Sequence, residues 1–192
     1  MGMAQPIATR RSVTGIPTGK LAVWWVLGSE IVIFGGLLSC YLFFRLLYGH
    51  WSEESVHTNT FAGSLNTLIL LTSSLFAVLA HRAAEVKDLR KAFMYLWLTI
   101  GGALGFLVVK GCEWTYEISH GFTIGKSLFW SFYYTAAGLH AIHVIAGAII
   151  MAIISFDVIK GKNLQRVELI GIYWHFVDIV WIFLFPLLYI AK

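Results

Sequence analysis

Five long apolar runs constrain the fold of this chain more than any other feature of its sequence. Across all five, the only Asp, Glu, Lys or Arg residues are Glu30 in the first run and Asp178 in the last. As helices rising about 1.5 Å per residue, all are long enough to cross a hydrocarbon core of about 30 Å. Helices also satisfy their backbone polar groups without water. We therefore predict an all-α integral membrane protein with five transmembrane helices, from runs at residues 21–44, 61–80, 92–109, 127–156 and 169–191.

The overall composition excludes an ordinary soluble domain. Hydrophobic residues make up 58% of the chain and charged residues only 12%, whereas soluble domains carry about 25% charged residues. A soluble helical bundle would also need charged outer faces, which these runs lack. The chain contains no nucleotide-binding loop, nucleophile elbow, zinc signature or basic nucleic-acid patch. We expect a multi-pass membrane protein that binds no nucleic acid.

The distribution of Lys and Arg predicts the topology. Ten basic residues precede the first run or lie in the second and fourth connections: Arg10, Arg11, Lys20, Arg82, Lys87, Arg90, Lys91, Lys160, Lys162 and Arg166. The other side would have only four, which are Arg45, Lys110, Lys126 and Lys192. Because basic loops tend to stay inside, we expect a cytoplasmic N-terminus and a C-terminus outside. The first connection, with Glu53 and Glu54, fits the outer side.

The same pattern sets the expected boundaries. Residues 1–20 are polar and lack the apolar core and cleavage site of a signal peptide, so we expect a cytoplasmic N-terminal segment there. Residues 21–192 should form one membrane domain, with helices near 21–47, 61–81, 92–114, 127–156 and 168–190. We expect an interfacial aromatic belt on the outer side, formed by Trp51, Trp114, Tyr116 and Tyr189.

Three polar residues are expected near the middle of the membrane. Counted along their helices, Glu30 and Asp178 lie about 15 Å deep and His140 about 20 Å deep. Ionisable groups at this depth normally face protein or water. We expect Glu30 to be uncharged unless a histidine contacts it, because burial disfavours the charged form. The sequence leaves open whether Glu30 takes part in proton transfer or is only a structural hydrogen-bond donor.

Two pairs of polar residues recur at a spacing of three. His140 and His143 share one face of the fourth helix, and His175 and Asp178 share one face of the fifth. One interpretation is a metal or haem site, or a proton relay. The other is a buried interhelical polar cluster, in which Asp178 accepts a hydrogen bond from an imidazole. We favour the structural interpretation, because buried polar groups in membranes must find partners whatever their function.

Several other residues carry weaker expectations. We expect Lys110 and Glu113 to form an interfacial salt bridge, with Lys110 extending towards the headgroups. We expect the two cysteines, Cys40 and Cys112, to be small residues packed in helices; both fall near the same outer end, so a disulfide remains open. The Gly101–Gly105 spacing of the GxxxG type suits close helix approach, and small residues recur around Gly138 and Gly147. Pro186 is expected to bend the last helix.

Four segments together resemble subunit III of the haem-copper terminal oxidases. Leu27-Gly-Ser-Glu-Ile-Val-Ile-Phe34 is similar to the family's helix with a buried Glu after Ser. Leu65-Asn66-Thr67, followed by Ser73-Ser74, resembles its Leu-Asn-Thr helix. The segment from Phe132 to Gly147 contains a His-x-x-His-Val pattern like that of the family, and Tyr173-Trp-His-Phe-Val-Asp-Ile-Val-Trp181 resembles its closing helix. The weaker Lys110-Gly-Cys-Glu-Trp114 adds the third helix, so the resemblance spans nearly the whole chain after residue 20.

The resemblance carries implications for function and partners. It implies the short five-helix form of a non-catalytic subunit that packs beside catalytic subunit I, which holds the haems and copper, with subunits II and IV nearby. It implies no metal in this chain, bound phospholipid, and buried polar or lipid-associated contacts at Glu30, His140, His143, His175 and Asp178. In the family, the subunit sustains proton uptake and protects subunit I from turnover inactivation. The complex would belong to the aerobic respiratory chain, with cytochrome c or quinol as electron donor and a supercomplex possible.

Three alternatives remain from the sequence. The chain could be a membrane cytochrome with haem held between His175 and either His140 or His143. It could be a small proton-coupled transporter that uses Glu30 and Asp178. It could also be an accessory subunit of a nitric oxide reductase, which shares the fold.

Overall fold

The computed structural model describes residue 15, residues 17–48 and residues 51–191, without the side chain of Ser52, and every regular element among them is helical apart from an isolated bridge residue at Pro17. The helices are α1 (Thr18–Tyr48), the short α2 (Trp51–Ser55), α3 (Thr60–Glu85), α4 (Leu89–Ser119), α5 (Leu128–Ile159) and α6 (Gln165–Phe185), which continues into a π-helical turn (Pro186–Ile190). Arg10, Arg11, Lys192 and most of the predicted segment 1–20 lie outside the described residues.

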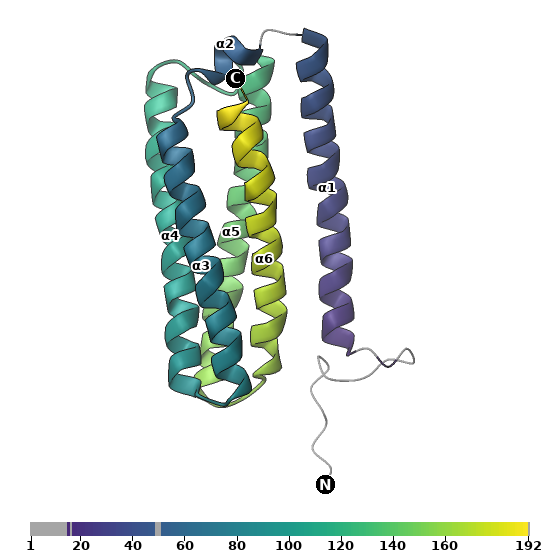
Figure 1. Ribbon diagram of the computed structural model, residues 1–192, viewed down its shortest axis with the longest axis vertical. Helices are drawn as coiled ribbons and strands as arrows, with labels where there is room; N and C mark the ends of the chain where they lie inside the picture. The colour runs from purple at the N-terminus through teal and green to yellow at the C-terminus, as the bar shows by residue number, and fades with distance from the viewer. Residues whose placement is uncertain (1–14, 16, 49–50, 192) are drawn as a thin grey trace.

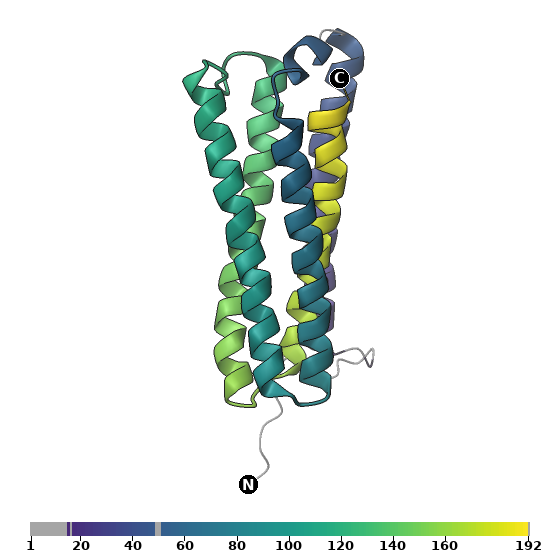
Figure 2. The same cartoon turned by 60° about the vertical axis from the view of Figure 1, so that its left-hand side comes forward.

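Five of these helices are long and apolar enough to cross a membrane. This confirms the prediction of an all-α protein with five transmembrane helices. Helices α3, α4, α5 and α6 form an antiparallel four-helix bundle in which α3 packs on α4 and α6, and α5 packs on the same two helices (Figure 2). Helix α1 stands beside this bundle and contacts α6 and, to a smaller extent, α5 (Figure 1).

The two ends of the molecule differ in charge. The start of α1 and the α3–α4 and α5–α6 connections lie together at one end, here called the basic end because it contains Lys20, Lys87, Lys160 and Lys162. The opposite end, here called the acidic end, contains α2 with Glu53 and Glu54. The structure therefore groups the connections as the predicted topology requires, and the assignment of the basic end to the cytoplasm stays a prediction.

Side-chain caps fix the starts of three bundle helices. Asn59 accepts a hydrogen bond from the backbone N–H of Ala62 at 3.1 Å, and Ser127 caps α5 in the same way. At the basic end, Asp88 accepts from the N–H of Lys91 at 3.1 Å. The hydrogen bonds from the Lys91 side chain and backbone lower the pKa of the Asp88 carboxyl, which favours the charged form at a helix N-terminus.

Glycines set the closest helix approaches, although not at the predicted register. A Cβ on Gly102 would lie 2.6 Å from Cβ of Ser73, so α4 meets α3 at this point. A Cβ on Gly101 would have no neighbour within 4 Å. The prediction of close helix approach at Gly101 is therefore wrong, and the next residue, Gly102, makes that approach. Gly147 brings α5 against Trp174 of α6, where an added Cβ would lie 2.9 Å from the indole ring. The expectation of close approach at Gly147 is confirmed.

Candidate functional site

Helix α1 is held against the bundle by contacts at three levels. At the basic end, Lys20 forms an ion pair with Glu168 of α6. Midway along the helix, Glu30 and Phe34 meet His143 of α5. Towards the acidic end, the Tyr41 hydroxyl donates to the backbone carbonyl of Leu187 at 2.7 Å. These contacts define a seam between α1 and the four-helix bundle. The side of α1 that faces away from the bundle is largely exposed.

The central contact of this seam pairs Glu30 with a histidine, the partner that the sequence left open. The Nε2 atom of His143 lies 3.0 Å from Oε2 of Glu30, within ion-pairing distance but not aligned as a hydrogen bond. The Nδ1 atom of His143 lies 2.8 Å from the carbonyl oxygen of Leu139. A carbonyl oxygen only accepts, so Nδ1 carries a proton.

The contact balances the two side chains at membrane depth, where a paired charge costs far less than a single one. Tyr173 supports it by donating to the backbone carbonyl of His143 at 3.2 Å.

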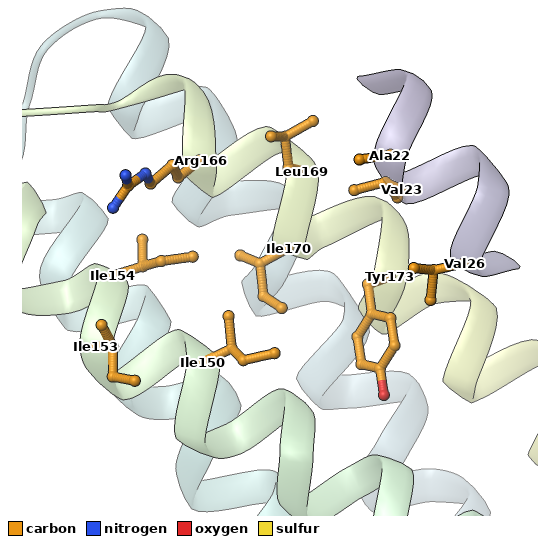
Figure 3. Close-up of a pocket in the computed structure, with 10 residues that line it drawn as sticks. All are labelled: Ala22, Val23, Val26, Ile150, Ile153, Ile154, Arg166, Leu169, Ile170 and Tyr173. Carbon is orange, nitrogen blue, oxygen red and sulfur yellow. The ribbon is translucent and has the colours of Figure 1, made fainter. Parts of the chain in front are cut away.

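An apolar groove of about 450 Å³ opens along the seam between this pair and the basic end. We call it the α1 groove. Its walls come from three helices, as Figure 3 shows, and it is lined by Ala22, Val23, Val26, Ile150, Ile153, Ile154, Arg166, Leu169, Ile170 and Tyr173. Arg166 is its one charged lining residue and forms an ion pair with Asp157 at 2.8 Å. Such a groove, apolar with an Arg–Asp ion pair at one end, can hold an acyl chain and place its headgroup beside that pair.

The remaining predicted site residues lie apart from this seam. His175 uses Nδ1 to contact the Ser74 hydroxyl of α3 at 2.6 Å. Among the described residues, the carboxylate oxygens of Asp178 have no hydrogen-bond partner, although Ser74 lies near enough to interact with them. His140 is fully buried between the rings of Phe106 and Trp181, and neither ring nitrogen has a partner in the described part of the chain.

The structure therefore does not bring the four residues of the predicted cluster into one hydrogen-bonded set. His143 turns to α1 and His175 turns to α3, so the expected hydrogen bond from an imidazole to Asp178 is not formed among the described residues. The physical reason is that residues three apart share a broad helix face, and α5 and α6 have several neighbours around that face. Because each imidazole is oriented by a different neighbour, the rings of α5 and α6 do not face one another as they would to hold a haem between them.

This arrangement predicts a small effect of changing Asp178. We expect Asp178→Asn to alter the free energy of unfolding by less than about 1 kcal/mol, because it keeps the shape of the side chain and removes no hydrogen bond. Ser74→Ala, which removes the contact to His175, should cost about 1 kcal/mol. Thermal unfolding of the two detergent-solubilised variants compares them. A larger loss in Asp178→Asn than in Ser74→Ala would mean that Asp178 anchors the α3–α6 contact after all.

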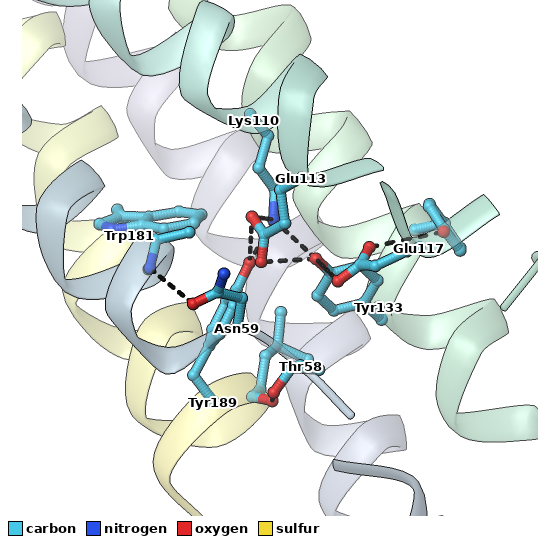
Figure 4. Close-up of polar contacts among 12 residues, drawn as sticks. Thr58, Asn59, Lys110, Glu113, Glu117, Tyr133, Trp181 and Tyr189 are labelled. Atoms are coloured by element: carbon cyan, nitrogen blue, oxygen red, sulfur yellow. Dashed lines mark hydrogen bonds and ion pairs between the residues drawn. The ribbon is translucent and has the colours of Figure 1, made fainter. Parts of the chain in front are cut away.

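A second polar site, near the acidic end, surrounds Lys110. We call Lys110, Glu113, Glu117, Tyr133 and Tyr189 the Lys110 network; Figure 4 shows it. Lys110 is only 1% exposed, so the expectation that it extends towards the headgroups is wrong. Its ammonium donates to Oε2 of Glu113 and to the Tyr133 hydroxyl, both at 2.9 Å, and to the Tyr189 hydroxyl. These three acceptors match the three N–H donors of an ammonium group.

The rest of the network holds the two carboxylates. Tyr189 donates to Oε2 of Glu113 at 3.1 Å, and Tyr133 donates to Oε1 of Glu117 at 2.9 Å. The rings of Trp114, Tyr133, Trp181 and Tyr189 lie 4.6–5.7 Å from Nζ of Lys110, close enough for cation–π attraction. The sequence signals Lys110 and Glu113 by their spacing, but nothing in it predicts Tyr133 or Tyr189 as partners.

At this end, two residues of the expected aromatic belt are covered by other parts of the protein: Trp51 packs on Tyr41, and Tyr189 belongs to the Lys110 network. Their depth in the membrane stays a prediction. Tyr116 is exposed, as expected there. The cysteines, expected to be small residues packed in helices, are free and exposed on α1 and α4.

Among the described residues, no group of three or more His, Cys, Asp or Glu side chains is placed to hold a metal ion.

Comparison with known proteins assigns the chain to a family. Residues 18–192 match the family model for cytochrome c oxidase subunit III. The chain therefore belongs to the cytochrome c oxidase subunit III family. It is a multi-pass protein of the plasma membrane and a component of a respiratory haem-copper oxidase, and membership implies association with the catalytic subunit I.

Individual relatives agree with this family. Cytochrome c oxidase subunit 3 of Thermostichus vulcanus is 34% identical over 167 residues, covering 84% of this chain and 82% of the relative. Its counterpart in Corynebacterium diphtheriae is 34% identical over 173 residues, covering 86% and 84%. A haem-copper oxidase subunit I+III of Aeropyrum pernix is 30% identical over 183 residues, covering 90% of this chain and 22% of that longer protein.

Proposed function

We propose that this subunit III is non-catalytic: it covers one side of subunit I, holds phospholipid in the α1 groove, and sustains the proton uptake and stability of subunit I. The observation that carries this proposal is the pairing of Glu30. Its partner is His143 of the same chain, at 3.0 Å, so the membrane-buried carboxyl is balanced internally. The haems and copper of the oxidase then belong to partner subunits, with subunits II and IV completing the complex.

The exposed side of α1 supports a partner on that side. Trp25, Val32, Phe43 and Leu46 are each more than 60% exposed along its length, and α1 buries only Leu27, Phe34 and Tyr41 within the described part of the chain. A membrane-spanning helix with so little contact to its own bundle is suited to pack against another subunit or lipid. In the proposed orientation the basic end is cytoplasmic, which follows the positive-inside tendency.

The α1 groove supports a lipid at the basic end of this seam. It is almost wholly apolar, and Arg166 at its rim is joined by Lys20 nearby on α1. Phosphate groups of lipids pair well with guanidinium and ammonium groups. A lipid here would fill the space that α1 leaves beside α5 and α6, and would extend the contact surface offered to subunit I.

Filling this groove tests the proposal. In the purified oxidase, Val26→Trp should displace lipid and speed turnover inactivation several-fold, while leaving the reduced-minus-oxidised haem spectrum unchanged. Ile33→Trp is the matched control, because Ile33 is a similarly exposed residue of α1 that does not line the groove. Lipid counts come from native mass spectrometry, and inactivation comes from oxygen consumption over time. Equal inactivation in both variants would argue against the groove, and a shifted haem spectrum would argue against a non-catalytic role.

A further inference from the structure

The Lys110 network borders a second groove, on the side of the bundle formed by α3 and α4. This acidic-end groove has a volume of about 390 Å³ and is lined by His57, Asn59, Phe61, Ala62, Leu65, Val108, Val109, Cys112, Glu113, Tyr116 and Glu117. Most of its wall is apolar, and its polar atoms gather at one end. Phe61 and Val108 are both exposed at its opening, so the groove faces the surroundings of the helices.

One buried acceptor lines this groove without a partner. Glu113 is only 6% exposed, and its Oε2 atom receives Lys110 and Tyr189. Its Oε1 atom is buried and has no hydrogen-bond partner among the described residues. A buried carboxylate oxygen without a donor is costly, and because Glu113 lines the groove, a donor bound there can supply one.

The charge balance of the network points to the same kind of ligand. Lys110 is its single cation, whereas Glu113 and Glu117 are two acids. Its other members, and the groove residues Tyr116 and His57, add no fixed positive charge. A cation with N–H donors therefore complements this end of the groove better than a neutral or anionic group.

The α3–α4 seam is hollowed again towards the middle of the membrane. One turn further along α3 lies a second hollow of about 250 Å³, lined by Leu68, Ile69, Thr72, Ser73, Phe76, Leu98 and Gly102. From Glu113 to Gly102 the helix rises about 16 Å, close to the roughly 15 Å thickness of one leaflet of the hydrocarbon core. An acyl chain that begins near Glu113 can follow this seam to the middle of the membrane.

We propose that the α3–α4 seam binds a phospholipid whose headgroup carries a primary ammonium. The ammonium donates to Oε1 of Glu113, and an acyl chain lies along the apolar seam. The phosphodiester lies at the rim, where the His57 ring, the Asn59 amide and the N-terminus of the long helix α3 offer donors and a positive dipole. This lipid lies in the opposite leaflet from the lipid of the α1 groove, and the proposal does not depend on that site.

The two native cysteines provide the test and its internal control. Cys112 lines the acidic-end groove, whereas Cys40 is exposed on α1. In delipidated oxidase, dioleoyl-phosphatidylethanolamine should slow alkylation of Cys112 by N-ethylmaleimide. Half-maximal protection should need roughly tenfold less of it than of dioleoyl-phosphatidylcholine, the ratio expected for one charge-assisted hydrogen bond. Alkylation of Cys40 should not change. Dioleoyl-phosphatidylcholine, whose trimethylated nitrogen has no N–H, should protect Cys112 far less.

Two variants separate the headgroup contact from the acyl contact. Glu113→Gln should remove the preference for the ethanolamine lipid over the choline lipid. Val108→Trp should block the opening and eliminate the bound lipid in native mass spectra, while Leu104→Trp, an exposed α4 residue that lines neither hollow, should retain it. If Glu113→Gln fails to assemble, the comparison of bound lipid in Val108→Trp and Leu104→Trp still tests whether the groove holds the lipid. Equal protection by both lipids would overturn the proposal. So would a Cys112 that resists alkylation even without lipid, because a neighbouring subunit would then cover the groove.

Discussion

Replacing Lys110 by methionine should lower the free energy of unfolding by about 3–5 kcal/mol, the cost typical of leaving one partner of a buried ion pair alone. The ammonium contacts Glu113, Tyr133 and Tyr189 at once, so its loss leaves a buried carboxylate without its cation and two hydroxyls without this donor. Methionine nearly preserves the volume of the side chain, which limits the effect to the lost charge and hydrogen bonds. Thermal unfolding of the detergent-solubilised chain, followed by circular dichroism, measures the change.

Two further variants make this result interpretable. Lys126→Met removes a lysine from the exposed α4–α5 connection and should change stability by less than about 0.5 kcal/mol. The double variant Lys110→Met with Glu113→Leu removes both partners of the buried pair, and it should recover part of the loss because no unpaired charge remains. A Lys110→Met variant as stable as Lys126→Met would show that the network does not stabilise the fold.

The fold could be predicted from the sequence because the membrane imposes strong rules on single segments. A run such as 127–156, without a charged residue, has few alternatives to a spanning helix, since its backbone must bond to itself. The observed α5, Leu128–Ile159, agrees closely with that run. The same rules act on each of the five runs separately, so no knowledge of neighbouring helices is needed.

The partners of the buried polar residues could not be predicted in this way. Spacing places His140 and His143 on one face of α5, but it does not reveal that α1 lies against His143 while His140 meets aromatic rings. Those neighbours depend on the rotation of each helix about its axis, which side-chain packing sets. Gly101 illustrates the same limit: a rotation of one residue makes Gly102 the glycine that meets Ser73.

The burial of Lys110 has a different cause. Its position near a helix end suggested an exposed lysine, because long basic side chains usually reach the interface. In the structure, the π-helical turn after Pro186 extends α6 to Tyr189, whose hydroxyl meets the ammonium. The network thus assembles from two helices and a widened turn, and none of these arrangements leaves a local signal in the sequence.

The packing of α5 on α6 leads to the second large effect, which is expected for Gly147→Ala. The new Cβ would lie 2.9 Å from two carbons of the Trp174 ring and 3.2 Å from the Tyr173 ring. The Trp174 indole cannot retreat freely, because its Nε1 donates to the Ser73 hydroxyl of α3 at 3.1 Å. Overpacking of this kind costs about 1–3 kcal/mol, and loss of the indole hydrogen bond adds about 1 kcal/mol. The better helix propensity of alanine returns about 1 kcal/mol, so we expect a net loss of about 2 kcal/mol.

Gly138→Ala is the matched control on the same helix. Its new Cβ would meet the Trp114 ring at 3.8 Å, an ordinary van der Waals contact, so helix propensity should dominate and stabilise the chain by up to about 1 kcal/mol. The two variants carry the same chemical change, and thermal unfolding should therefore separate them by about 3 kcal/mol. The strain at Gly147 should also reach the α1 seam, since Tyr173 supports the backbone of His143, the partner of Glu30. Variants of equal stability would mean that α5 and α6 can move apart without cost, and that their contact does not position the Glu30–His143 pair.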